Sequence, residues 1–83
     1  MFSQPTQTLL GMQGIQNGFG KRVRYLRMKN KWTQDEFADI SGFHRAYIGT
    51  VERGETNISL KNIQILAKAL RVKMTELFRG LDD

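Results

Sequence analysis

The sequence predicts an all-α protein built from five short helices. Apolar residues recur at intervals of three and four along most of the chain, which is the period of one helix face. Helix start and stop signals separate these stretches at short intervals. Strand signals and internal repeats are absent from the sequence, so no sheet is expected.

The first helix is expected over residues 19–29, and the domain over 19–80. Residues 1–18 carry no charge, and Pro5 and three glycines interrupt any periodic pattern, so we interpret them as a flexible N-terminal tail. The alternative is an arm that folds over a partner, although such arms usually carry cations. Residues 19–31 hold six cations and no anion. The apolar stripe of this basic helix is formed by Phe19, Val23 and Leu26.

The second helix is expected to start at a capping box. In this motif the Thr33 hydroxyl accepts from the Glu36 amide, and the Glu36 carboxylate accepts from the Thr33 amide. Trp32 and Phe37 occupy the two positions of a hydrophobic staple. Gly42 follows nine residues after Thr33, so the helix is short.

The third helix is expected between Gly42 and Gly54, with Ile48 and Val51 as its apolar stripe. The side chains on its other side are short, with the exception of one arginine. Small residues around a single long cation indicate a face that approaches something closely. That side carries Arg45, Ala46, Gly49 and Thr50.

Two helices are expected in the C-terminal part of the chain. Ser59 is a predicted N-cap for a fourth helix over residues 60–70. Its apolar stripe contains Leu60, Ile63, Leu66, Ala67 and Leu70. A last short helix is indicated by Val72, Leu77 and Phe78.

The charge balance favours a polyanionic partner. Thirteen Lys and Arg against eight Asp and Glu give a formal charge of +5, which is typical of proteins that bind nucleic acid or an acidic membrane surface. Simple solubility is the alternative explanation. No apolar run approaches the ~18 residues that span a bilayer, and the N-terminus lacks the basic start of a signal peptide, so we expect a cytoplasmic protein.

Catalysis, metals and cofactors are not expected. The chain has no cysteine, which removes disulfides and thiolate chemistry. His44 has no second histidine and no suitably spaced carboxylate near it, so it is not a predicted metal ligand. The clustered carboxylates Asp35, Glu36 and Asp39 are explained by helix capping and solvation. We therefore expect neither an enzyme nor a small-molecule substrate.

A capped helix, a turn with glycine and a second amphipathic helix together describe a helix-turn-helix. Over residues 18–80 the chain contains the motifs Phe19-Gly20-x-Arg22-Val23-Arg24-x-Leu26-Arg27, Trp32-Thr33-Gln34-x-Glu36-Phe37-Ala38, Ser41-Gly42, Tyr47-Ile48, Val51-Glu52-Arg53-Gly54 and Leu66-Ala67-x-Ala69-Leu70. In these motifs it resembles the Cro/repressor-type (XRE) helix-turn-helix proteins. The stretch His44-Arg45-x-Tyr47-Ile48-Gly49-x-Val51-Glu52-Arg53-Gly54-Glu55-x-Asn57-Ile58-Ser59-Leu60-x-Asn62-Ile63 is similar in particular to the controller proteins of restriction-modification systems. Lys31 and Arg71 stand where the family often has a helix-ending glycine, and Lys73 stands where a Ser or Thr cap is usual.

The resemblance implies a five-helix, lambda-repressor-like domain whose third helix enters the major groove of DNA. The base-reading residues would be His44, Arg45, Ala46, Gly49 and Thr50. Arg45 is the main candidate, because its planar fork can donate to both O6 and N7 of one guanine; a solvated surface arginine is the alternative. Ala46 and Thr50 could contact thymine methyl groups.

Other positions would bind phosphates or hold the fold together. Phosphate contacts are expected from Gln34, Tyr47, Arg53, Asn57 and Ser59. Gln34 could instead be an ordinary surface glutamine, and Tyr47 could pack its ring. Arg27 and Glu52 match positions that pair in many family members, so we predict a partly buried salt bridge between them.

A second apolar face in the C-terminal region needs cover. The resemblance implies that it forms a homodimer, which would place two third helices roughly 34 Å apart on an inverted-repeat operator; completion of a monomer core is the alternative. The interface candidates are Ile65, Ala69, Val72, Met74, Phe78 and Leu81. The sequence thus predicts a dimeric transcription regulator that binds double-stranded DNA. An antitoxin-type or phage-type repressor is the nearest alternative, and a protein-interaction adaptor that does not bind DNA is a more distant one.

Overall fold

A computed structural model describes residues 5–82, with side chains from Gly14 onward. Within these residues it contains four α-helices, one 3-10 helix and no strand, which confirms the all-α class. The elements are α1 (Pro5–Lys29), α2 (Gln34–Ser41), α3 (Arg45–Glu52), α4 (Leu60–Leu70) and the 3-10 helix η1 (Met74–Phe78).

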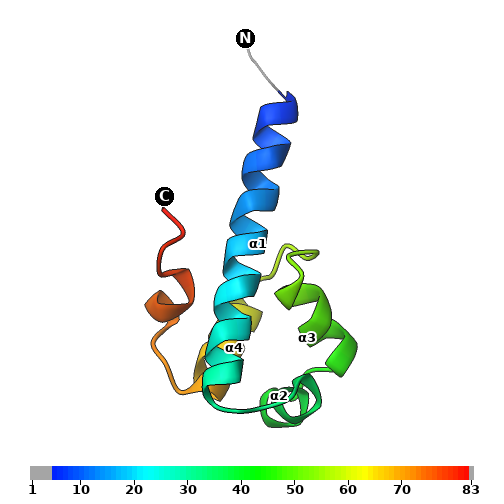
Figure 1. The fold of residues 1–83 in the computed structure, drawn as a ribbon, viewed down its shortest axis with the longest axis vertical. Helices are drawn as coiled ribbons and strands as arrows, with labels where there is room; N and C mark the ends of the chain where they lie inside the picture. Colours follow the sequence, from blue (N-terminus) through cyan, green and yellow to red (C-terminus); the bar gives the residue numbers. More distant parts are fainter. Residues whose placement is uncertain (1–4, 83) are drawn as a thin grey trace.

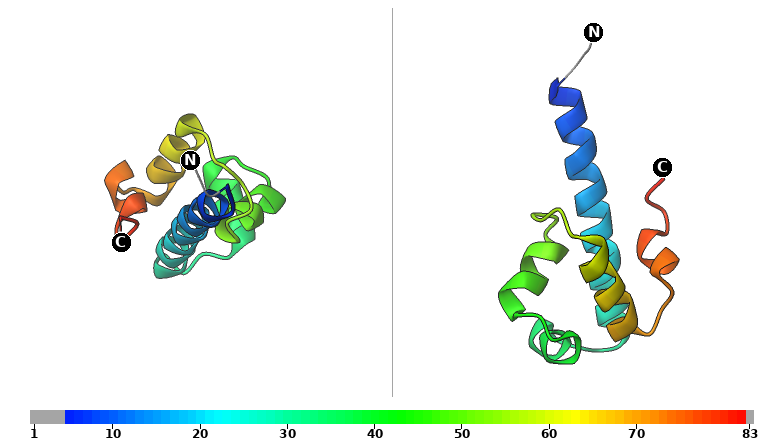
Figure 2. Two further views of the ribbon diagram at one scale, coloured as in Figure 1. Left: turned by 90° about the horizontal axis from the view of Figure 1, so that it is seen from above. Right: turned by 180° about the vertical axis from the view of Figure 1, so that it is seen from behind.

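The first helix is the rod on which the other elements are assembled. α2 and α3 lie on one side of its C-terminal half, and η1 lies on the opposite side (Figure 1). Seen from behind, α4 lies between α3 and η1 (Figure 2). The N-terminal half of α1 extends beyond the other helices, so the molecule measures 46 Å in its longest dimension against 23 and 21 Å in the other two.

The core lies where the five elements meet. Each element contributes one large side chain that is fully buried, and these are Val23, Phe37, Ile48, Leu66 and Leu77. Because every element contributes a buried side chain, none can leave the assembly without opening the core. Leu60 is an exception to the predicted stripe of α4, since it is 76% exposed at the first position of that helix.

The start of α1 differs from the sequence prediction. The helix begins at Pro5 rather than near Phe19, so the chain is helical through most of the segment interpreted as a tail. Proline suits the first helical position, where its missing N–H would have no partner. Glycines inside a helix cost only about 1 kcal/mol each, and the end of this segment packs: Gly18 lies directly against Leu81, and Asn17 against Gly54.

The ends of α1 and α4 and the start of the last helix also differ from the usual family pattern. The predicted fifth helix is a 3-10 helix, and Lys73 before it makes no side-chain cap. Lys31 and Arg71, which replace expected glycines, adopt left-handed backbone angles with φ of 63° and 59°. This conformation costs a non-glycine residue roughly 1–2 kcal/mol. The left-handed turn is therefore kept at both sites, and the backbone of Lys31 and of Arg71 is strained as a result.

One glycine allows α1 and α3 to cross at close range. A Cβ atom at Gly20 would collide with the Val51 carbonyl oxygen and would lie 2.6 Å from the Glu52 carbonyl oxygen. Both oxygens belong to the last turn of α3, and backbone moves less readily than a side chain. The distance between the two helices is therefore set by the missing side chain at Gly20.

We expect Gly20→Ala to lower the free energy of unfolding by about 2 kcal/mol, because overpacking costs more than the helix propensity of alanine returns. Urea unfolding followed by circular dichroism measures the change. Gly14→Ala is the matched control: a Cβ there meets nothing within 4 Å, so this variant should gain up to about 1 kcal/mol. Equal stability of the two variants would contradict the close crossing.

Candidate nucleic-acid interface

The turn into α2 is built as the sequence predicts. Thr33 Oγ1 accepts from the Glu36 amide at 3.0 Å, and Glu36 Oε1 accepts from the Thr33 amide at 2.8 Å, which confirms the capping box. The rings of Trp32 and Phe37 stack with their centroids 5.9 Å apart. Gly42 then ends α2 in the left-handed conformation with φ of 83°. These contacts fix the direction in which α2 leaves α1 and the turn that leads to α3.

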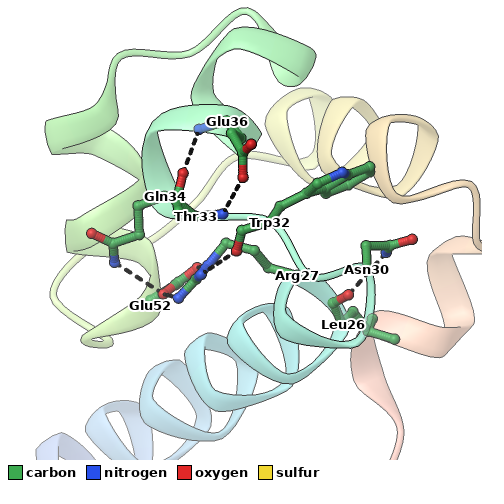
Figure 3. A network of polar contacts seen from close by, with 8 residues as sticks. All are labelled: Leu26, Arg27, Asn30, Trp32, Thr33, Gln34, Glu36 and Glu52. Carbon is green, nitrogen blue, oxygen red and sulfur yellow. Dashed lines mark hydrogen bonds and ion pairs between the residues drawn. The ribbon is translucent and has the colours of Figure 1, made fainter.

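A buried ion pair joins this turn to α3 (Figure 3). Arg27 Nε donates to Glu52 Oε2 at 2.6 Å, and Nη2 donates to Glu52 Oε1 at 3.0 Å. The two residues are 9% and 8% exposed, so the pair expected from the sequence is present and nearly dry. Arg27 Nη1 also donates to the Trp32 carbonyl at 2.7 Å. One guanidinium thus holds α1, the loop before α2, and α3 together.

The predicted reading face is partly presented to solvent. His44, Arg45 and Ala46 are exposed at the start of α3, and His44 makes no side-chain cap. Thr50 is half-buried, and its hydroxyl donates to the Tyr47 carbonyl at 2.7 Å. Arg45 Nε lies 3.3 Å from Asp35 Oδ1 of α2, and both side chains remain mostly exposed. Four of the five predicted base-reading residues therefore reach the surface.

Gly49 departs from the prediction because it is buried. The guanidinium of Arg53 covers it, and a Cβ atom at Gly49 would lie 2.9 Å from Arg53 Nη1. The sequence shows a small residue on the outer side of the helix, but it does not show that the arginine four positions later folds back over it. In this structure the far end of the exposed Arg53 side chain lies over Gly49.

Gln34 and Tyr47, two of the residues predicted to bind phosphate, already make hydrogen bonds within the protein. Gln34 Nε2 donates to Glu52 Oε1 at 3.0 Å, which leaves the second amide proton of Gln34. The Tyr47 hydroxyl accepts from Asn62 Nδ2 at 3.0 Å, and its own proton is left to donate. The Tyr47 ring also packs on Phe43, with centroids 4.9 Å apart. Tyr47 can therefore pack its ring and make a polar contact at the same time.

Arg53 is exposed and lies 3.0 Å from Glu55 Oε2. The hydrogen bond that Arg53 donates to the Glu55 carboxylate, together with the negative charge of Glu55, raises the pKa of the Arg53 guanidinium. Arg53 lines a surface hollow together with Gln34 and Arg24, above the buried ion pair. Arg24 is exposed, and sequence reasoning missed it as a site residue. The available signal for Arg24 was its position in the basic run of the first helix. That run alone does not indicate which of its cations face α3.

Asn57 and Ser59 lie in the segment between α3 and α4, and both are exposed. Ser59 Oγ accepts from the Asn62 amide at 3.1 Å, so Ser59 is the N-cap of α4, as expected. Asn57 lies in the loop that precedes this cap and also lines an apolar hollow with Ile15 and Phe78.

The six predicted interface residues line two different hollows or pack against the core. Ile65 and Ala69 line a hollow between α2 and α4, together with Ile40. Phe78 and Leu81 line a different hollow, against Ile15 of α1. The remaining two, Val72 and Met74, are half-buried against the core. Ile40 was not predicted; it is 48% exposed, and its apolar character next to the polar residue Asp39 was the available signal.

Two negative observations concern the described residues only. Among residues 5–82, no helix combines the length and the apolar character needed to cross a membrane. Within the same range, no three His, Asp or Glu side chains gather in a way that could hold a metal ion.

Comparison with known proteins gives matches over most of the chain. The HTH_3 family model, described as helix-turn-helix, matches residues 23–77. The control protein C.SmaI of Serratia marcescens is 44% identical over 63 residues, which are 76% of this chain and 75% of that protein. The control protein C.BamHI of Bacillus amyloliquefaciens is 42% identical over 60 residues, 71% of this chain and 74% of that one.

A solved structure gives the same result. The restriction-modification controller protein C.AhdI from Aeromonas hydrophila superimposes with a TM-score of 0.73 and is 47% identical in sequence. The superposition covers 75% of this chain and 94% of that protein. The resemblance first seen in the motifs therefore extends to the three-dimensional structure.

We expect Arg27→Met to lower the free energy of unfolding by about 3–5 kcal/mol, because it leaves the Glu52 carboxylate buried without its cation. Thermal and urea unfolding measure the loss. The matched control is Arg79→Met, which breaks the exposed pair with Glu76 at 3.6 Å and should cost less than about 1 kcal/mol. The double variant Arg27→Met/Glu52→Leu should recover much of the loss. A loss as small as that of the control would contradict the role of the pair.

Proposed function

Because the chain belongs to the HTH_3 helix-turn-helix family, we propose that it is a sequence-specific DNA-binding transcription regulator of the restriction-modification controller type. The observation that carries the proposal is the exposed start of α3, where His44, Arg45 and Ala46 project from a rigidly held helix. The relatives named above as control and controller proteins support the assignment to this type. A regulator of this kind acts in the cytoplasm and carries out no reaction.

The proposed division of labour follows from the chemistry of each side chain. Arg45 donates to O6 and N7 of a guanine, and Ala46 contacts a thymine methyl group in the major groove. The free amide proton of Gln34, the hydroxyl proton of Tyr47 and the guanidinium of Arg24 bind phosphates and set the position of α3. Asn57 and Ser59 bind the backbone farther along the duplex. The net charge of +5 attracts the duplex as a whole.

We further propose that the active species is a homodimer on an inverted-repeat operator. The proposed interface is the hollow lined by Ile40, Ile65 and Ala69, because it joins apolar residues from α2 and α4 on the outside of a small domain; Ser41, Lys68 and Arg71 also line it. Two copies related by a two-fold axis would present their third helices to successive major grooves about 34 Å apart. Phe78 and Leu81 complete the packing on α1 instead.

The DNA proposal is tested by selecting bound sequences from a random duplex pool and then measuring affinity against salt. We expect the selected sequences to contain an inverted repeat. We also expect a plot of log affinity against log salt concentration to have a negative slope of about 0.9 per neutralised phosphate. Arg45→Ala should lose ~1–3 kcal/mol of preference at one guanine per half-site. Arg24→Ala should weaken all sequences alike and reduce the salt slope by about 1. Affinity that does not vary with salt would favour the protein-interaction adaptor.

The dimer proposal is tested by sedimentation equilibrium. We expect Ile65→Lys to shift the protein towards monomer, since it replaces an apolar contact with a cation in a hollow that Lys68 and Arg71 already line. Leu60→Lys introduces the same charge at a residue of α4 that is already 76% exposed, and it should leave the oligomeric state unchanged. A monomeric wild-type protein at micromolar concentration, or a dimer that survives Ile65→Lys, would exclude this interface.

A further inference from the structure

A carboxylate lies beside the proposed base-reading arginine, and its place in the first turn of α2 suits the helix dipole without accounting for the arginine next to it. Asp35 Oδ1 is 3.3 Å from Arg45 Nε, with the Asp35 side chain 76% and the Arg45 side chain 63% exposed. A surface that meets phosphates is expected to lack anions, because each one repels the duplex. The capping box of α2 uses Thr33 and Glu36, so Asp35 makes no hydrogen bond in that cap.

The contact engages one particular nitrogen of the guanidinium. Arg45 is the first residue of α3, and a side chain there leans back towards the preceding turn and α2. Nε is the guanidinium nitrogen paired with Asp35, so Nη1 and Nη2 form the edge that is left to donate. Two parallel N–H groups on one edge are the arrangement that a guanine accepts through O6 and N7. An untethered arginine would lose the freedom of several rotatable bonds on binding.

We infer that Asp35 is a positioning residue that holds the Arg45 guanidinium with its Nη edge ready for a single guanine. The inference rests on the proposed function, because it assumes that Arg45 reads a base. Asp35 does not touch the base; it acts through Arg45. When the pair enters the groove it loses water, and its attraction becomes stronger than at the free surface.

The same carboxylate raises selectivity in a second way. On a sequence without the guanine, Asp35 contributes repulsion from nearby phosphates, and no guanine contact offsets it. On the correct sequence the oriented Arg45 offsets that repulsion. Asp35 therefore weakens binding to incorrect sequences more than binding to the operator, which is the general advantage of a repulsive element in recognition.

The test compares Asp35→Asn with Asp39→Asn in the full-length protein. Asp39 is exposed one turn further along α2, and the ion pairs found among the described residues do not include it. Both variants remove one negative charge from the same helix. Affinity is measured for the selected operator and for the same duplex with the Arg45 guanine replaced. Asp35→Glu, which keeps a carboxylate, is the conservative variant, and thermal unfolding checks that each protein is folded.

We expect Asp35→Asn to reduce the preference for guanine about 5-fold, whereas Asp39→Asn leaves it unchanged and tightens binding to both duplexes alike. Asp35→Glu should retain most of the preference. In an Arg45→Ala background, Asp35→Asn should have no further effect on the preference, because the residue on which it acts is gone.

Equal guanine preference in Asp35→Asn and Asp39→Asn would overturn the inference and make Asp35 an ordinary surface charge. A further loss of preference in the Arg45→Ala background would overturn it as well. If Asp35→Asn is not folded, Asp35→Ser replaces it on the same two duplexes: a guanine preference about 5-fold lower is expected, and an unchanged preference would overturn the inference. A wild-type protein that shows no sequence preference would refute the proposed function itself, which is a distinguishable result.

Discussion

The ion pair between Arg27 and Glu52 is the interaction on which the arrangement of this molecule depends. It is nearly dry, it is bidentate, and its spare donor binds the carbonyl of Trp32 in the loop before α2. Gln34 adds a fourth participant from α2. Hydrophobic contacts hold the same elements together, but they do not specify direction. The pair fixes the orientation of α3 relative to α1, and this orientation determines where the exposed residues of α3 project.

The surface around this pair combines cations with a few well-placed anions. Arg24 and Arg53 line the hollow above the buried pair, while Asp35 and Glu55 each lie beside an exposed arginine. A uniformly basic face would attract any polyanion. Exposed arginines that are already paired offer less attraction to a random phosphate and keep their donors for partners of matching geometry. The charge pattern is therefore better suited to discrimination than to strong binding alone.

Local signals in the sequence predicted most of the fold. The capping box at Thr33 and Glu36 and the glycine at position 42 are short-range chemistry, and each fixed a helix end correctly. The start of α1 was missed, because glycines and a lack of charge were interpreted as a tail although a helix tolerates both when its end is packed. The 3-10 helix near Leu77 was predicted only as a helix, since its type depends on how the chain packs on α1 and α4.

The candidate site was harder to predict than the fold, because it depends on contacts between elements. The Arg27–Glu52 pair was expected only through family resemblance, since 25 residues separate the partners. No local pattern indicates that Arg53 covers Gly49, that Gln34 is bound to Glu52, or that Ile40 joins Ile65 in one hollow. Helix periodicity places a residue on a face of its own helix. Which other element occupies that face is decided by the tertiary packing.

The close crossing at Gly20 has a consequence for how this chain can diverge. Every other amino acid carries a Cβ atom, so a single replacement at this position forces α1 and α3 apart. The distance between α1 and α3 therefore cannot change gradually through substitutions at this position. Ala46 and Arg45, in contrast, touch nothing that the frame needs, and they are open to exchange. On the proposed function, such a molecule is evolvable: new specificities can arise on the outer turn of one helix while the inherited architecture stays the same.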